Sequence, residues 1–382
     1  MDLVIKGIYI HIPFCHQICH YCDFNKVFFK NQPVDSYIEA LGLEMKMFVE
    51  KYRHLLHVKT IFLGGGTPTA LSPAQLQRLF DLIQQYIPLD HLQEFTSEAN
   101  PDELTFEKLV VMKKNGINRL SIGVQSFDSD ILERLGRTHT TDHVYKTLEM
   151  AKDIGFENIS IDLMYGLPGQ TMDQWKDTLQ KALDLNLPHY SAYSLIVEPK
   201  TVFYNLMTKG KLMLPGEDLE ADMYDWLMNQ MASKGIHQYE ISNFAKTGYH
   251  SQHNNLYWEN VNYAGFGAGA HGYVETIRYA NIGPIRKYID TVSEGAFPIQ
   301  SSHEVTPTEQ MEEEMFLGLR KVDGINRFHF NEKFGVTLDE VYGEVISKHI
   351  SNGTMISTEE SVAISKQGRF IGNEIFQTFL EK

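Results

Sequence analysis

Cysteine is scarce in this sequence: the 382 residues include three, and all of them lie between positions 15 and 22. Three clustered thiols cannot form a framework of paired disulfides and are typical of a reducing compartment, so we expect a cytoplasmic protein. The segment from Met1 to Phe14 lacks the long apolar core and the small-residue cleavage site of a signal peptide. The sequence also lacks a run of roughly 18 apolar residues, which a membrane span requires.

Positive charge is also in short supply. Lys and Arg number 34 against 49 Asp and Glu, which gives a formal net charge of -15, and the basic residues are spread thinly along the chain. Such a charge balance repels phosphate backbones, so we expect no nucleic-acid partner. Hydrophobic residues are abundant, at 43% of the sequence, and this composition describes a folded globular protein with a sizeable core.

The first 200 residues alternate short apolar segments with amphipathic ones. Apolar segments of strand length lie at 8–12, 60–63, 94–96, 119–124, 159–163 and 191–195. Between them, apolar residues recur at three- and four-residue spacing, which predicts helices over 34–52, 72–86, 105–115, 142–154 and 172–185. This alternation favours parallel strands joined by crossover helices. Six such units predict an α/β fold with a partial (βα)6 barrel, whose functional groups gather at the carboxyl ends of the strands.

The pattern changes after about residue 200. A predicted helix over 218–233, a strand-like segment over 238–241 and a glycine-rich stretch over 265–272 follow one another. From residue 306 onward, helical patterns surround a β-rich piece over 354–364, which is compatible with a small winged-helix-like α+β unit. We therefore expect a barrel domain over 1–236, a connector over 237–305 and a C-terminal domain over 306–382. The C-terminal helices carry acidic residues and no basic recognition face, which favours a lid or a partner surface over DNA binding.

The three cysteines form the pattern C-x3-C-x2-C, with Cys15, Cys19 and Cys22 directly after the first predicted strand. Three thiolates on one tight loop can hold three corners of a [4Fe-4S] cluster and leave the fourth iron open. An open iron can bind the amino and carboxylate groups of S-adenosylmethionine (SAM) and pass an electron into its sulfonium. A zinc site completed by His16 or His20 uses the same ligand types, but structural zinc sites usually draw on two separated pairs. The cluster is therefore the favoured hypothesis.

The cysteine motif and five further segments together resemble a known family. The pattern C-x3-C-x-Tyr-Cys, after a segment that runs from Tyr9 to Phe14, is similar to the radical SAM signature in its porphyrin-related branch. The other matching segments are 64–69, 98–101, 123–127, 135–139 and 162–171. Over nearly its whole length the sequence resembles the oxygen-independent coproporphyrinogen III oxidase superfamily, and most closely the HemW-type haem chaperones within it. The resemblance implies a radical SAM core followed by a HemN-like C-terminal domain.

The resemblance also implies a set of SAM contacts. Glycines after the second strand let a ligand touch the backbone, and fixed opposite charges match the zwitterionic methionine end of SAM. Taken singly, each residue is equally well explained as a strand-end polar group or a core aromatic, and only their joint placement favours a ligand site. The implied contacts are Gly65, Gly66 and Thr67 at the glycine turn, Glu98 and Arg137 at the methionine end, Gln125 and Asp162 near the ribose, Tyr9 beside the methionine moiety and Tyr21 beside the adenine.

Two features separate this sequence from the oxidases of the superfamily. The oxidases carry a further cysteine two positions after the third, where this sequence has Phe24, and the difference argues against decarboxylation of coproporphyrinogen. The segment from His253 to Trp258 resembles the H-N-x-x-Y-W element associated with haem in the chaperone branch. Imidazole is a common axial ligand of haem iron, and aromatic rings offer flat apolar faces to a macrocycle. The resemblance thus implies His253 as a haem ligand, although without it this histidine, one of sixteen, would be interpreted as structural.

The leading hypothesis is a haem chaperone that binds haem and transfers it to an acceptor protein, and that carries a [4Fe-4S] cluster and an exchangeable SAM. The alternative is an oxygen-independent coproporphyrinogen III oxidase, which would convert propionates to vinyl groups by radical SAM chemistry. As partners we expect haem, an acceptor protein that can be membrane-associated, an electron donor such as a flavodoxin or ferredoxin, and a second copy of the chain in a homodimer.

Overall fold

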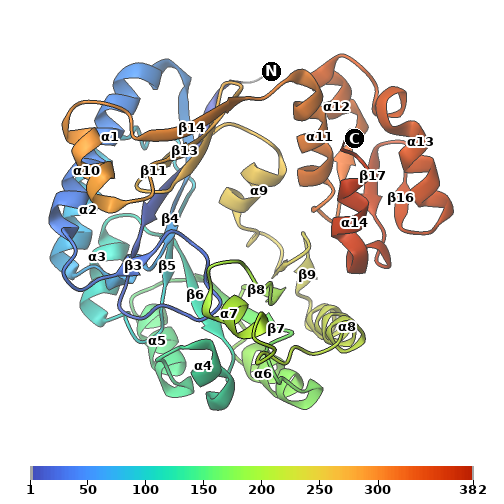
Figure 1. Cartoon of the computed structure of the whole chain (residues 1–382), viewed down its shortest axis with the longest axis horizontal. Coiled ribbons are helices and arrows are strands. Elements are labelled where there is room, and N and C mark those ends of the chain that lie inside the picture. The colour runs from blue at the N-terminus through green and yellow to red at the C-terminus, as the bar shows by residue number, and fades with distance from the viewer. Residues whose placement is uncertain (1–2, 381–382) are drawn as a thin grey trace.

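A computed structural model describes residues 3–380 of the chain (Figure 1). Its main feature is a 12-stranded sheet with the order β14-β13-β12-β11-β1-β4-β5-β6-β7-β8-β10-β9. The central run is parallel throughout. Its members are β1 (Ile5–Ile12), β4 (Leu56–Gly65), β5 (Glu94–Ala99), β6 (Arg119–Gln125), β7 (Asn158–Tyr165) and β8 (His189–Ser194). These are the six strands predicted from the sequence, each somewhat longer than its apolar segment.

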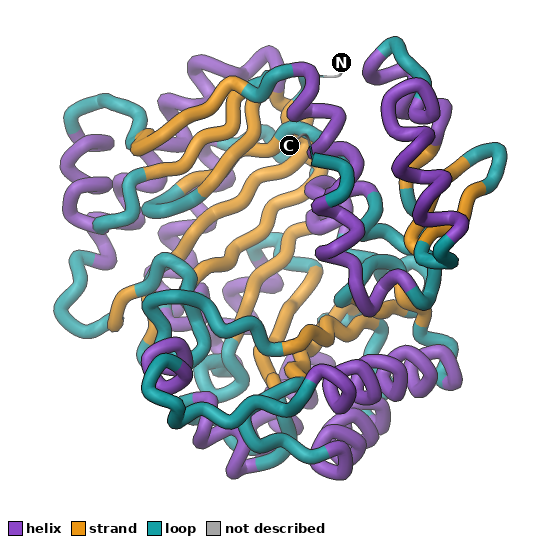
Figure 2. Tube along the Cα trace, turned by 45° about the vertical axis from the view of Figure 1, so that its right-hand side comes forward, coloured by secondary structure: helices purple, strands orange, loops and turns teal. Residues whose placement is uncertain are grey.

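Helices connect the central strands and lie along the outer face of the curved sheet, as Figures 1 and 2 show. They are α1 (Val34–Tyr52), α2 (Pro73–Tyr86), α3 (Phe106–Lys114), α4 (Ser129–Leu135), α5 (Thr141–Asp153) and α6 (Met172–Asp184). Side-chain caps begin several of them: Ser72, Thr140 and Thr171 each close a capping box that satisfies two free backbone N–H groups. The predicted partial (βα)6 barrel is confirmed, with the short helix α4 as an addition.

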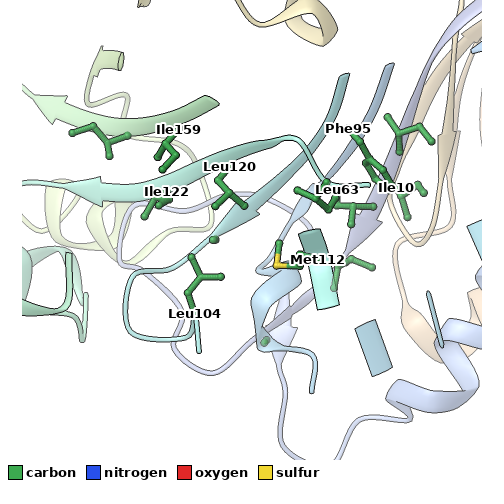
Figure 3. Packing of buried hydrophobic residues seen from close by; sticks show 14 of the residues in the cluster. Ile10, Leu63, Phe95, Leu104, Met112, Leu120, Ile122 and Ile159 are labelled. Atoms are coloured by element: carbon green, nitrogen blue, oxygen red, sulfur yellow. The ribbon is translucent and has the colours of Figure 1, made fainter. Parts of the chain in front are cut away.

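The alternation of side chains along each strand divides the sheet into two different faces. Buried apolar residues point toward the helices, where Ile10, Leu63, Phe95, Leu120 and Ile122 pack with each other and with the helices (Figure 3). Full burial of one such side chain contributes about 1.5–3 kcal/mol. The intervening residues of the same strands face the concave side of the sheet, which we call the lumen. The lumen end at the start of the strands is called the floor.

The region predicted as a connector, 237–305, belongs to the barrel sheet instead. β10 (Asn243–Ala245) and β9 (His237–Gln238) extend it antiparallel beyond β8, and β11 (Tyr263–Phe266) pairs parallel with β1. β12 (His271–Val274), β13 (Ile277–Asn281) and β14 (Ile299–Glu304) then continue the edge. These strands were missed because they are short and, in β14, exposed along the whole length, so they carry no apolar alternation. The strand-like segment predicted over 238–241 is a strand only at its first residue.

Four more helices lie between β8 and β14 along the chain: α7 (Val202–Met207), α8 (Glu217–Ser233), α9 (Gln252–Trp258) and α10 (Ile285–Ser293). Helix α9 lies on the lumen side of the sheet at the floor, because a Cβ at Gly7 in β1 would lie 2.9 Å from Leu256 Cδ1. In Figure 1, α9 stands between the barrel and the C-terminal unit. The two short strands β2 (Phe14–Cys15) and β3 (Val27–Phe28) pair beside the cysteine loop.

The C-terminal residues form a winged-helix-like unit with its own hydrophobic core. It contains α11 (Pro307–Gly318), β15 (Ile325–Asn326), α12 (Arg327–Phe334), α13 (Leu338–Ser351), β16 (Met355–Ser357), β17 (Ser361–Ile364) and α14 (Gly372–Gln377). Polar contacts join it to the barrel, among them the ion pair of Arg278 with Glu313 and the backbone bond from Ile241 N–H to the Arg320 carbonyl. Among the described residues, no helix combines the length and apolar character that crossing a membrane requires.

The packing between sheet and helices gives a first prediction. Phe95 is 2% exposed and its ring meets Phe80 of α2 edge-on, whereas Phe106 is 57% exposed. Phe95→Ala is expected to lower the free energy of unfolding by about 3–5 kcal/mol, because it leaves a cavity in the core. Phe106→Ala should change it by less than about 0.5 kcal/mol. Urea unfolding followed by circular dichroism measures both, and equal losses would contradict the proposed packing.

Candidate cluster and cofactor site

The cysteine loop lies at the carboxyl end of β1. Pairing of β2 with β3 closes the loop at its base, and the N–H groups of Val27 and Phe29 donate to the carbonyls of Pro13 and Cys15 at 2.8 Å each. Cys15 is buried, and the other two cysteines are half-buried. The fold therefore presents three thiols from one short loop at the end of the barrel where parallel α/β folds place their chemistry.

Burial raises the pKa of the Cys15 thiol to about 12 and also raises that of Cys22. Both thiols would therefore stay protonated near neutral pH unless a cation deprotonates them, as a bound metal does. Two donors already point at the sulfur atoms: Thr67 Oγ1 lies 3.6 Å from Cys15 Sγ, and Arg137 Nη1 lies 3.4 Å from Cys19 Sγ. The donor set fits a [4Fe-4S] cluster, whose electronic properties depend on such hydrogen bonds to sulfur.

The two histidines of the loop, considered above as a fourth zinc ligand, have other contacts. His20 Nδ1 donates to the carbonyl of Arg134 at 2.8 Å, and the His16 ring packs against Phe29 with 4.7 Å between centroids. No group of three or more His, Cys, Asp or Glu side chains among residues 3–380, the three cysteines included, is spaced to share one metal ion. A [4Fe-4S] cluster does not require that spacing, because each thiolate binds a different iron.

The glycine turn at the end of β4 packs directly under the cysteine loop. Gly65 has a φ of 114°, which favours glycine, and its N–H donates to Glu98 Oε2 at 3.1 Å. A Cβ at Gly66 would lie 3.0 Å from Cys15 Sγ and 2.8 Å from the Pro13 carbonyl carbon. Glycine is required here because backbone and sulfur approach so closely. Gly66 and Thr67 therefore lie beside Cys15.

Three polar residues that the sequence predicted at the strand ends meet in the lumen. Burial raises the pKa of Glu98 to about 8, with a further contribution from the Asp162 charge, and burial also raises the pKa of Asp162. Ser121 Oγ donates to Asp162 Oδ1 at 3.2 Å, and the Tyr193 hydroxyl donates to Gln125 Oε1 at 3.3 Å. Gln125 has a φ of 64°, a strained conformation for a residue other than glycine that is often found at functional sites.

The remaining predicted contacts frame the same space. Arg137 follows the left-handed Gly136 at the end of α4, and besides Cys19 its guanidinium donates to the Gly123 carbonyl at the end of β6. Tyr21 packs with the apolar cluster that includes Leu195. Tyr9 faces the lumen from β1, and its hydroxyl lies 2.9 Å from His11 Nδ1. Tyr21 belongs to the cysteine loop itself, and the other residues predicted to contact SAM lie in the lumen or at the strand ends that border it.

His253 is the exception, because it lies at the floor and is 1% exposed. Its Nδ1 is 2.7 Å from Thr60 Oγ1 and its Nε2 is 2.8 Å from the Tyr257 hydroxyl, so both ring nitrogens are engaged. Burial lowers the pKa of His253 to about 3, which keeps the ring neutral. The expectation that His253 ligates haem iron does not fit this geometry. The sequence motif could not reveal that the imidazole turns inward.

Sequence reasoning missed the residues that hold the cysteine loop in place. His11 Nε2 lies 2.7 Å from the Asn25 carbonyl, and Asn25 Nδ2 donates to the carbonyls of Ala268 and Gly283 at 2.8 and 3.1 Å. The glycine-rich stretch 265–272, to which no role was assigned, therefore braces the loop. The available signal was the run of glycines itself, of which Gly267 and Gly269 have positive φ values in the structure.

A cavity of about 440 Å³ lies between α9, the strands β11 and β13, and α11. Aromatic side chains of Tyr257, Trp258, Tyr263 and Phe316 line it, together with the paired Arg278 and Glu313. Within the described part of the chain, two buried donors next to it, Trp258 Nε1 and Asn260 Nδ2, have no hydrogen-bond partner. With its aromatic walls, the cavity is suited to a flat, largely apolar ligand.

Comparisons with known proteins agree with this arrangement. The profile of the Radical SAM superfamily matches residues 9–182, and that of the HemN C-terminal domain matches residues 305–371. The chain is 53% identical to the heme chaperone HemW of Bacillus subtilis (strain 168), over 98% of this chain and 99% of that protein. It is 34% identical to the heme chaperone HemW of Escherichia coli (strain K12), over 98% of each. Coproporphyrinogen III oxidase (HemN) from Escherichia coli has the same fold, with a TM-score of 0.84 at 22% identity, covering 99% of this chain and 90% of that one.

The close approach at Gly66 gives a prediction for the cluster. Gly66→Ala places a methyl group 3.0 Å from Cys15 Sγ, so the cysteine loop must shift. We expect the chelator concentration that removes half the iron from the anaerobically reconstituted protein to fall by about tenfold or more. Gly216→Ala is the matched control, because its Cβ would meet no heavy atom within 4 Å. Equal iron retention in both variants would contradict this account of the turn.

The raised pKa of Glu98 predicts a pH dependence of SAM binding. A carboxyl with a pKa of about 8 is mostly protonated at neutral pH, and the fixed positive charge of the sulfonium favours its ionised form. Binding then expels the proton, so SAM affinity should rise between about pH 6 and pH 8, by at most about tenfold per unit, and level off above. Titration calorimetry measures this slope. In Glu98→Gln, SAM should bind more weakly, and binding should release about one proton fewer. If the pH dependence of SAM affinity is the same in this variant, Glu98 is not the group that releases the proton.

Proposed function

Because the chain belongs to the HemW family within the radical SAM superfamily, we propose that it is a haem chaperone, which binds haem and passes it to an acceptor protein. The observation that carries this proposal is 53% identity to a heme chaperone over 99% of that protein's length. Phe24 supports it from the sequence, because the oxidases resembled above have a cysteine at this position.

Membership of the superfamily implies a [4Fe-4S] cluster and SAM. We propose that Cys15, Cys19 and Cys22 hold the cluster, which supplies one-electron chemistry at the sulfonium of SAM when bound. Thr67 and Arg137 then stabilise the thiolates by donating hydrogen bonds to two of the sulfur atoms. We further propose that SAM lies in the lumen, in contact with Tyr9, Tyr21, Gly65, Gly66, Thr67, Glu98, Gln125, Arg137 and Asp162.

For haem we propose the cavity between α9 and α11. Its aromatic walls match a flat apolar macrocycle. Tyr257 and Trp258 belong to the motif that resembles the haem-associated element. We therefore propose that this motif contributes aromatic walls to the haem site and that His253 does not ligate the iron.

The proposal includes partners that meet the cluster end of the barrel. Phe24 and Phe28 beside the cysteine loop are 57% and 54% exposed, and they offer an apolar surface to a partner or to a second copy of the chain. We propose an electron donor of the flavodoxin or ferredoxin type, an acceptor protein that can be membrane-associated, and a homodimer. A cytoplasmic location suits the unpaired thiols.

Anaerobic assays with reconstituted protein, SAM and a reductant separate the chaperone from the oxidase. With haem, we expect one equivalent to bind and to move to an added apo-haemoprotein. With coproporphyrinogen III, we expect no vinyl-bearing product. Product formation at enzyme-like rates, or failure to bind haem, would overturn the proposed function.

The cavity gives a more specific prediction. Trp258→Ala is expected to weaken haem binding by roughly tenfold to a hundredfold, because it removes a large flat contact and a buried donor. Trp226→Ala is the matched control: this partly buried tryptophan packs on the barrel core and lies near Lys176, away from the cavity. His253→Gln should leave the position of the haem Soret band unchanged, because the imidazole is not an iron ligand. Absorption titrations with haem measure all three variants. A shift of the Soret band in His253→Gln would show that His253 is an iron ligand after all.

A further inference from the structure

A column of four aromatic rings connects the lumen with the cavity. The Tyr9 ring stacks on Phe62, with 6.2 Å between centroids and 25° between planes, and Phe62 stacks on the His253 imidazole at 5.2 Å and 29°. His253 meets the Tyr257 ring edge-on at 5.1 Å, and the two are joined by the 2.8 Å hydrogen bond. We call Tyr9, Phe62, His253 and Tyr257 the aromatic column.

The two ends of the column lie in the two proposed ligand sites. At the upper end, a Cβ on Gly64 would lie 2.9 Å from Phe62 Cε1 and 3.0 Å from Glu98 Oε2, so Phe62 and Glu98 pack against the same turn. The Tyr9 hydroxyl is held by His11, which also bonds to the cysteine loop. At the lower end, Tyr257 lines the cavity. A ligand in the lumen and a ligand in the cavity would thus contact the same stack.

Helix α9, which carries the lower half of the column, is fixed by barrel residues. Glu94 of β5 accepts hydrogen bonds from the backbone N–H groups of Gln252 and His253 at 2.9 and 3.0 Å, which places a carboxylate at the start of the helix. Thr60 of β4 holds the His253 ring. Side chains of β4 and β5 thus fix the helix that carries the cavity wall residue Tyr257.

We propose that His253 is a positioning residue, and that through the aromatic column SAM in the lumen strengthens the binding of haem in the cavity. This inference rests on the proposed function. SAM beside Tyr9 restricts the upper rings, and the stack and the His253 hydrogen bond pass this restriction to Tyr257. Haem then binds to a cavity wall that is already ordered, so the protein loses less conformational entropy when haem binds. This is positive cooperativity between the two ligands. By reciprocity, haem strengthens SAM binding by the same factor.

The inference identifies a conservative variant. A neutral imidazole has one donor and one acceptor nitrogen, and here both are used. Tyr257→Phe keeps the ring in the cavity but leaves His253 Nε2 without its partner, which breaks the link between the halves of the column. Tyr224→Phe is the matched control, because it likewise removes the hydroxyl of a buried tyrosine. Tyr224 lies on α8, outside the column, and its hydroxyl donates to the carbonyl of Ile241.

The experiment measures the haem dissociation constant with and without saturating SAM, in the cluster-loaded protein under anaerobic, non-reducing conditions. In the unmodified protein and in Tyr224→Phe, SAM should lower the haem dissociation constant by about fivefold or more. In Tyr257→Phe, the dissociation constants with and without SAM should be nearly equal. The reverse titration must return the same factor. An equal haem affinity with and without SAM, or a full effect in Tyr257→Phe, would overturn the inference and leave the chaperone function standing.

A second measurement does not require haem. Hydrogen exchange of the α9 amides, residues 252–258, should slow when SAM is added to the unmodified protein and to Tyr224→Phe, but not to Tyr257→Phe. If haem fails to bind at all, the proposed function is wrong, and the exchange of α9 alone decides whether the column transmits. Unchanged exchange in the unmodified protein would overturn the inference.

Discussion

The two-residue period of the central strands is the constraint on which the rest of this molecule depends. It sends every second side chain toward the helices, where apolar residues build the core, and the others toward the lumen, which therefore has to accommodate polar groups. Glu98 and Asp162 are half-buried there, and desolvation raises the pKa of both carboxyls, so their ionisation is costly. Arg119, 2% exposed on β6, supplies a positive charge from the floor. A lumen lined in this way suits a polar, charged ligand better than an apolar one.

The cysteine loop depends on contacts from distant parts of the chain. Thr67 reaches Cys15 from the turn after β4, Arg137 reaches Cys19 from the end of α4, and Asn25 ties the loop to the glycine-rich stretch near residue 268. The loop itself is too short to fix three thiols. Its geometry is therefore a property of the whole barrel, which explains why the sequence match extends far beyond the cysteines.

The sequence predicted the barrel well, because each strand and helix of the barrel has its own local pattern of apolar residues and this pattern repeats along the chain. The period of apolar residues gave α1 with its observed bounds, and the C-x3-C-x2-C spacing identified the cysteine loop without any structure. The convergence of Glu98, Gln125 and Asp162 followed from their places at the ends of parallel strands. The strands β11 to β14 were missed because they are short and because β14, which ends the sheet, is exposed along its whole length and carries no apolar alternation. The inward turn of His253 was missed because it depends on Thr60, a residue 193 positions away, and on a helix too short for a periodic signal.

The cavity beside α9 has walls that belong to two separately packed bodies. Tyr263 and the strand edge belong to the barrel, whereas Phe316 on α11 packs against the core of the C-terminal unit. These bodies are joined by polar contacts such as Arg278 with Glu313 and also by apolar ones, since Ile241 packs against the C-terminal core. A ligand in this cavity would touch both bodies at once, so its binding would add to the contacts that hold the C-terminal unit against the barrel.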